Sequence, residues 1–168
     1  MVKLLVATNN RGKVIEYEEI LREELPPGVE FTFPAQEELC LDVDESGKTF
    51  EENARLKAVE FARASGLLTL ADDSGLEVDA LGGAPGVYSA RYAGSGTTDA
   101  DRYRKLLGEL TDVPPEERSA RFRCVVALAD PAGVLGTAEG AVEGEIGFEP
   151  RGEMGFGYDP VFVVDGYD

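Results

Sequence analysis

Two adjacent carboxylates follow an apolar run near the middle of the chain. Asp72 and Asp73 come directly after residues 67–71, and Ser74 and Gly75 follow them. The apolar run predicts a buried β-strand, and the tip of a strand holds side chains rigidly. Because neighbouring aspartates repel each other, they are best tolerated beside a cation or in a solvated cleft. The alternative is an acidic turn between two strands.

A second polar segment joins a predicted strand to a predicted helix close to the N-terminus. Residues 2–7 are strand-like, residues 8–13 read Thr-Asn-Asn-Arg-Gly-Lys, and apolar residues then recur at helical spacing. Backbone N–H groups at the start of a helix are unpaired and the helix dipole is positive there, which suits a phosphate group. Lys13 adds a positive charge. The segment lacks the Walker A spacing, and an ordinary polar turn is the alternative.

Two further segments carry residue types that could contact a ligand. Asn53 and Lys57 share one face of a helix that Thr49 and Glu52 are predicted to cap, so Lys57 could be a second phosphate contact. A solvated helix face is the alternative. Residues 156–160 read Phe-Gly-Tyr-Asp-Pro, in which an aromatic ring could stack on a base beside flexible glycines. A tight turn with aromatic rings in the core is the alternative there.

Composition narrows the class of protein. The net charge is −17, from 16 basic and 33 acidic residues, which argues against a broad nucleic-acid surface. A small anionic ligand would need a divalent cation to offset this field. Histidine is absent, so the usual general base and zinc ligand are missing, and Cys40 and Cys124 form no CxxC pair. Apolar runs are too short to span a membrane and no signal peptide is visible, so we expect a cytoplasmic protein.

The predicted elements indicate one α/β domain with a mixed sheet. A strand–helix order at the start is followed by an antiparallel hairpin that turns at residues 130–133. A long acidic connection, residues 34–48, precedes the second helix, and such loops are often functional. Strands are predicted at residues 2–7, 30–33, 67–71, 76–78, 120–129, 134–145 and 161–164, and helices at 13–24, 49–65 and 98–110.

Taken together, these segments resemble the inosine triphosphate pyrophosphatase family. The family's Thr-x-Asn-x-x-Lys motif stands at residues 8–13, and its Thr-Phe-x-Glu-Asn-Ala motif at residues 49–54. The long central signature is present from residue 71 to residue 94 as ADDSGLEVDALGGAPGVYSARYAG. Gly-Phe-Gly-Tyr-Asp-Pro follows at residues 155–160. The resemblance covers essentially all 168 residues.

The resemblance implies a role for each matching residue. Asp73 would be the proton acceptor for water and would bind Mg²⁺ together with Asp44, with Glu45 and Asp72 as close neighbours that assist. The triphosphate would be bound by Thr8, Asn9, Asn10, Arg11, Gly12, Lys13 and Lys57. The nucleoside pocket would be lined by Ser74, Phe156, Gly157, Tyr158 and Asp159.

The resemblance also implies a fold and a reaction. Residues 1–168 would form a single domain, an elongated mixed sheet flanked by helices with a central cleft, and the protein would be a homodimer. The reaction would be Mg²⁺-dependent hydrolysis of ITP, dITP and XTP to the monophosphate and pyrophosphate. A nucleotide-binding module without turnover is the main alternative, and a phosphatase that releases orthophosphate is a weaker one.

One part of the family pattern is not matched. Family members continue for about another helix, which carries a lysine and a Ser-His-Arg segment that contacts the 6-oxo edge of the purine. This sequence ends at Asp168. The sequence as given is therefore expected to lack that helix and to select its base more weakly.

Overall fold

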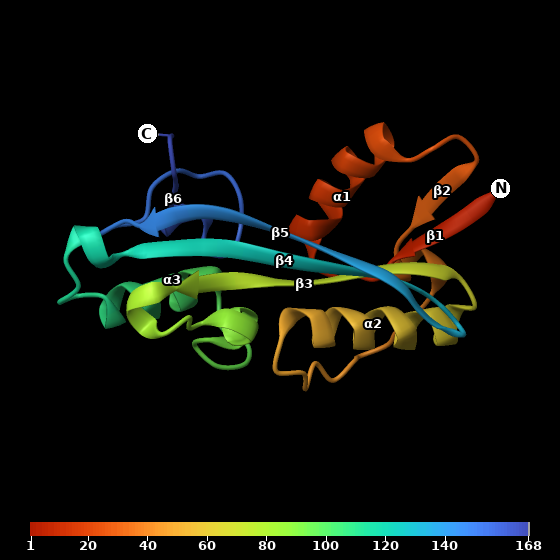
Figure 1. The fold of residues 1–168 in the computed structure, drawn as a ribbon, viewed down its shortest axis with the longest axis horizontal. Helices are drawn as coiled ribbons and strands as arrows, with labels where there is room; N and C mark the ends of the chain where they lie inside the picture. The colour runs from red at the N-terminus through yellow and green to blue at the C-terminus, as the bar shows by residue number, and fades with distance from the viewer. Residues whose placement is uncertain (168) are drawn as a thin grey trace. The chain divides into compact units, whose positions relative to one another are not determined.

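The computed structural model describes residues 1–167 and contains a six-stranded mixed sheet with the strand order β2-β1-β3-β4-β5-β6 (Figure 1). The chain divides into two compact units. The first comprises Met1–Asp73 and Val125–Glu139, and the second comprises Ser74–Cys124 and the described residues from Gly140 onward. The strands are β1 (Val2–Val6), β2 (Val29–Thr32), β3 (Leu68–Val78), β4 (Ser119–Asp130), β5 (Gly133–Ile146) and β6 (Phe162–Val164), and the α-helices are α1 (Arg11–Glu24), α2 (Phe50–Ser65) and α3 (Asp99–Glu109).

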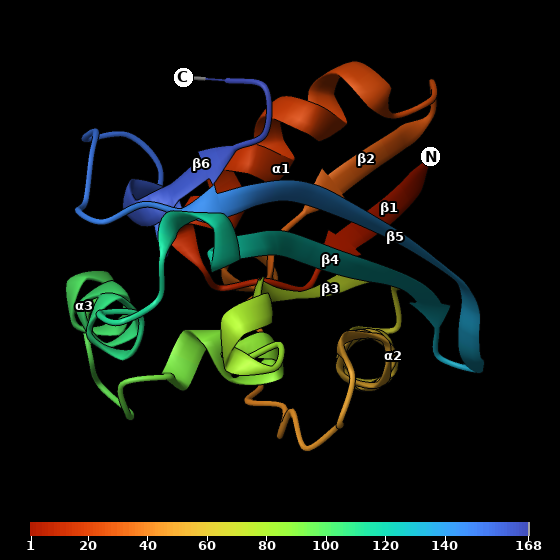
Figure 2. The ribbon, with the colours of Figure 1, turned by 60° about the vertical axis from the view of Figure 1, so that its left-hand side comes forward.

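Parallel pairing organises the first unit. Strand β1 pairs in parallel with β2 and with β3, and the pairing with β3 ends where Val6 lies opposite Leu70. Strand β1 lies between these two strands, and its residues 4–6 are apolar and buried, as is usual where helices cover both faces of a parallel sheet. Helices α1 and α2 lie on opposite sides of these strands (Figure 2). Strand β1 therefore ends beside the first residues of β3, where the Ala7 N–H also donates to the Leu70 carbonyl at 2.8 Å.

Strand β3 is longer than the sequence predicted. Asp72 and Asp73 were expected at a strand tip, but β3 continues through both of them to Val78. The expected break is absent because each aspartate has polar partners from other elements, which compensate for its burial. The two carboxylates therefore lie within a strand, just beyond the last residue that pairs with β1.

The start of α2 follows the predicted capping pattern with one shift. The Thr49 hydroxyl accepts a hydrogen bond from the Glu52 N–H at 3.1 Å, as expected for an N-cap. The Glu52 carboxylate accepts from the Lys48 N–H at 2.6 Å, one residue before the position of a standard capping box. The helix ends at Gly66 in the left-handed conformation, with a φ of 72°.

The second unit has its own apolar core between α3 and the strands. Its buried residues are Leu76, Val78, Leu106, Leu110, Ala120, Ile146, Tyr158 and Val161. Thr98 caps α3 in a full capping box with Asp101, and β6 pairs antiparallel with the end of β5. Within the residues that the structure describes, no helix is long and apolar enough to cross a membrane.

A buried arginine links three segments of this second unit. Arg118 is only 2% exposed, and its guanidinium donates to the carbonyls of Leu110 (2.6 Å), Val113 (3.0 Å) and Gly147 (3.0 Å). The guanidinium carbon also lies 3.9 Å from the centroid of the Phe148 ring. Leu110 is the C-cap of α3, where the negative end of the helix dipole favours a cation. Arg118 thus ties the end of α3 to the segment that follows β5.

We expect Arg118→Ala to lower the free energy of unfolding by about 3 kcal/mol, because truncation leaves buried carbonyls without donors and creates a cavity. Urea unfolding followed by circular dichroism measures this change. Arg151→Ala is the matched control, since the Arg151 side chain is 80% exposed and its removal should change the value by less than about 0.5 kcal/mol. Equal midpoints for the two variants would contradict the structural role of Arg118.

Candidate functional site

The segment between β1 and α1 is shaped by its own polar side chains. The Asn10 N–H donates to the Thr8 hydroxyl, and the Asn10 side-chain oxygen accepts from the Lys13 N–H, both at 3.2 Å. Asn10 is therefore the N-cap of α1. Asn9 and Arg11 are exposed beside it. The predicted phosphate segment thus presents the positive end of a helix dipole next to a surface open to solvent.

Both predicted phosphate-binding lysines converge on Asp72. The Lys13 ammonium lies 2.6 Å from Asp72 Oδ2, and the Lys57 ammonium donates to the Asp72 carbonyl at 3.0 Å. Asp72 is 4% exposed, so its carboxylate lies in a medium where charge interactions are strong. Residues from α1, α2 and β3 are therefore joined at one point.

Asp73 has a different environment from its neighbour. It is 7% exposed, and its Oδ2 accepts a hydrogen bond from the Asn53 side-chain amide at 2.9 Å. Burial raises the pKa of the Asp73 carboxyl, and the hydrogen bond from Asn53 offsets part of that rise. The nearby Glu45 raises this pKa further, whereas the two lysines lower it. A buried carboxylate with a raised pKa is typical of a group that accepts or releases protons in a reaction.

The acidic connection reaches this cluster through Glu45 and Gly47. The Glu45 carboxylate forms an ion pair with Lys57, and the Gly47 N–H donates to the Asn53 side-chain oxygen at 2.7 Å. Asp44, the residue predicted to bind a metal with Asp73, lies on the same connection and is exposed. The sequence marked Asn53 as a helix-face neighbour of Lys57 and as part of the motif at residues 49–54, but neither pattern indicated that it joins the connection to Asp73.

The donor chemistry of this cluster suits a hard cation. Across residues 1–167, no three side chains of the Asp, Glu, His or Cys types gather into a preformed metal cage. Mg²⁺ does not require one, because it is usually held by one or two carboxylates together with substrate phosphates and water. The Asp73 carboxylate and the carboxylates of the acidic connection would provide such oxygen ligands. The residues present therefore fit a magnesium ion that binds together with a phosphate substrate.

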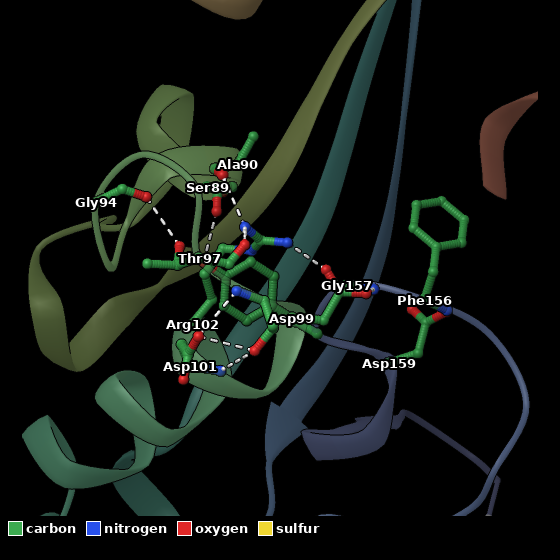
Figure 3. A network of polar contacts seen from close by, with 12 residues as sticks. Ser89, Ala90, Gly94, Thr97, Asp99, Asp101, Arg102, Phe156, Gly157 and Asp159 are labelled. Atoms are coloured by element: carbon green, nitrogen blue, oxygen red, sulfur yellow. Dashed lines mark hydrogen bonds and ion pairs between the residues drawn. The ribbon is translucent and has the colours of Figure 1, made fainter. Parts of the chain in front are cut away.

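The glycine-rich segment of the second unit is held by backbone and core contacts (Figure 3). The Gly157 N–H donates to Asp99 Oδ2 and the Phe156 N–H donates to Asp159 Oδ2, both at 2.9 Å. The Tyr158 hydroxyl donates to the Ser89 carbonyl at 2.7 Å, and Tyr158 is 4% exposed within the core. Figure 3 shows the Phe156 ring pointing away from the Asp99 network. Of the two aromatic rings, that of Tyr158 belongs to the core, whereas Phe156 is only half-buried.

Asp99 and Arg102, which the sequence did not single out, organise this region (Figure 3). Arg102 forms an ion pair with Asp99 and donates to the carbonyls of Ala90 (3.1 Å) and Thr97 (2.9 Å). Partial burial raises the pKa of Asp99, but the hydrogen bond from Gly157 and the Arg102 pair bring it below its usual value. Asp99 is the first residue of α3, directly after the N-cap Thr98.

Comparison with known proteins supports the resemblance inferred from the motifs. The profile of the Ham1 family matches residues 4–168. A dITP/XTP pyrophosphatase of Bacillus subtilis (strain 168) is 48% identical over 168 residues, which are 100% of this chain and 83% of that protein. The dITP/XTP pyrophosphatase of Desulforamulus reducens is 52% identical over 166 residues, which are 99% of this chain and 81% of the relative.

Solved structures agree with this assignment. The structure of a HAM1 protein from Coxiella burnetii is similar with a TM-score of 0.83 and 43% identity, covering 98% of this chain and 82% of that one. A dITP/XTP pyrophosphatase from Mycobacterium abscessus gives a TM-score of 0.81 with 42% identity, covering 98% of this chain and 85% of that one. The match in sequence and in fold extends over nearly the whole length, and the chain therefore belongs to the Ham1 family.

Proposed function

We propose that the chain hydrolyses deaminated purine nucleoside triphosphates, such as dITP, ITP and XTP, to the monophosphate and pyrophosphate. The names of relatives that are about half identical over the whole chain support this substrate class. The observation that carries the proposal is the cluster in which Lys13, Lys57 and Asn53 surround Asp72 and Asp73. Such a cluster combines phosphate-binding cations with a carboxylate suited to activate water.

The two lysines bind the triphosphate in this proposal. In the structure they are held by Asp72 and Glu45, whose carboxylates occupy positions where phosphate oxygens would compete. The Lys57 side chain is 17% exposed and that of Lys13 is 20%, so both remain accessible to an anion from solvent. Thr8, Asn9, Asn10, Arg11 and Gly12 complete the proposed triphosphate site at the start of α1. The lysines then stabilise negative charge on the departing pyrophosphate.

Asp73 is the proposed general base. Asn53 occupies its Oδ2, so Oδ1 is the atom that accepts the proton from the attacking water. Asp73 and Asp44 would hold Mg²⁺, with Glu45 as a neighbour. When bound, the ion neutralises phosphate charge and lowers the pKa of a coordinated water.

The nucleoside would contact Ser74, Phe156, Gly157, Tyr158 and Asp159. Because the Tyr158 ring lies in the core, its contribution is to hold the segment, and base stacking is assigned to Phe156. We further propose a cytoplasmic homodimer, for which the exposed Leu135 and Val142 of β5 offer apolar surface. Light scattering after gel filtration gives the mass in solution, and a monomer at micromolar concentration would exclude that assembly.

Phosphorus NMR of dITP incubated with the chain and Mg²⁺ tests the reaction directly. We expect the resonances of deoxyinosine monophosphate and pyrophosphate to appear together. Orthophosphate as the first product would instead indicate a phosphatase. Calorimetric binding of dITP without any product would favour the nucleotide-binding module.

We expect Asp73→Asn to lower kcat at least about 100-fold, because the amide cannot accept the proton from water. The substitution is nearly isosteric, so the thermal unfolding midpoint should change little. The exposed Asp42 of the acidic connection provides the matched control, and Asp42→Asn should retain normal turnover. Near-normal kcat for Asp73→Asn would remove this residue from its role.

Lys57→Gln should lower kcat/KM for dITP by about 100-fold, because a neutral amide cannot stabilise charge on the leaving group. Lys48→Gln is the comparison, since Lys48 lies exposed on the adjoining connection. Steady-state kinetics of both variants measure the difference. Equal losses in the two variants would point to the net charge of the surface rather than to a contact made by Lys57.

A further inference from the structure

We propose that Asn53 is a positioning residue that couples the docking of the acidic connection to the orientation of Asp73. This inference rests on the proposed function, because it assigns Asn53 to the same reaction. Asn53 is completely buried, and both ends of its side-chain amide are used. The nitrogen donates to Asp73 Oδ2 at 2.9 Å, and the oxygen accepts from the Gly47 N–H at 2.7 Å. One side chain thus bridges the connection and the strand.

The Gly47 contact determines which way the amide faces. A backbone N–H can only donate, so the atom of Asn53 that faces Gly47 must be the oxygen. The nitrogen must then face Asp73, where it presents a donor to the carboxylate. If the amide turned over, a carbonyl oxygen would meet the Asp73 carboxylate and an N–H₂ group would meet the Gly47 N–H, and both contacts are repulsive. The connection therefore keeps the amide in the orientation that Asp73 requires.

The close approach of the connection also explains why residue 47 is glycine. A Cβ atom at position 47 would lie 2.5 Å from the Asn53 side-chain oxygen and 2.8 Å from the Glu52 Cβ. Neither distance is tolerable without movement, so any side chain here would push the connection away from α2. A second contact lies one helical turn along, where Lys57 pairs with Glu45 and donates to the Asp72 carbonyl. Helix α2 thus holds the connection at two points, and each leads to one aspartate of β3.

Fixing Asp73 in this way has a direct chemical effect. The hydrogen bond from Asn53 restricts rotation of the carboxylate, and in the proposed reaction Oδ1 is then held ready to accept the proton from the attacking water. Loss of the Gly47 bond would free the amide and, through it, the carboxylate, although Gly47 itself would touch neither substrate nor Asp73. The step most affected should be turnover rather than substrate binding, because the phosphate-binding lysines are not changed.

The test compares Gly47→Ala, Asn53→Ala and the double variant with the unchanged chain. We expect Gly47→Ala to lower kcat for dITP by about tenfold or more while KM changes less than about threefold. The double variant should be no worse than Asn53→Ala alone, since both substitutions break the same bridge. Gly136→Ala in β5 is the matched control, because a Cβ there would meet nothing within 4 Å. It should leave both constants unchanged.

NMR of the Asn53 side-chain amide supplies a readout that does not depend on activity. In the unchanged chain its two protons should be distinct and protected from exchange, and Gly47→Ala should abolish that protection. Unchanged protection, unchanged kcat, or strictly additive losses in the double variant would each overturn the coupling. If the unchanged chain shows no turnover, the proposed function is wrong but the bridge can still be tested. Loss of Asn53 amide protection in Gly47→Ala would show the bridge without any measurement of activity. If Asn53→Ala does not fold, the kcat and the amide protection of Gly47→Ala test the coupling by themselves, because this variant keeps every side chain of the cluster.

Discussion

The burial of two adjacent carboxylates within a strand is the constraint on which the first unit depends. An unpaired charge in such a place would be strongly unfavourable, so Asp72 and Asp73 require partners from other elements. Those partners are Lys13 from α1 and both Asn53 and Lys57 from α2. The positions of the two helices and of the acidic connection are therefore coupled to the electrostatics of β3. A fold built only on apolar packing would not need these contacts.

Several features of the fold and the site could be predicted from local sequence alone. The mixed sheet, the three helices and the family were predicted correctly, because apolar periodicity and ordered motifs are local signals. The end of the third strand was predicted wrongly at the aspartates, since a run such as Asp-Asp-Ser-Gly is typical of a turn when its partners are unknown. The compensation comes from Lys13 and Asn53, which are 59 and 20 residues away along the chain.

The same reasoning explains which residues of the site were missed. Lys13 and Lys57 were singled out because a lysine near a helix start or on a shared helix face has a recognisable pattern. Asp99 and Arg102 can pair with each other at helical spacing, but their contacts to backbone groups of Gly157, Ala90 and Thr97 have no sequence pattern. A contact to a backbone atom depends on the path of the chain rather than on residue type. Only the three-dimensional structure can reveal it.

The position of Tyr158 affects how this protein could change during evolution. Its ring belongs to the apolar core, while its backbone belongs to the segment assigned to the nucleoside. Selection for stability and selection for ligand binding therefore act on the same residue. Substitutions there would alter ligand preference only at the expense of folding. Phe156 is only half-buried and lies outside that core, so substitutions there should affect folding less. Divergence in base preference among descendants of this chain should therefore accumulate at position 156 and leave position 158 unchanged.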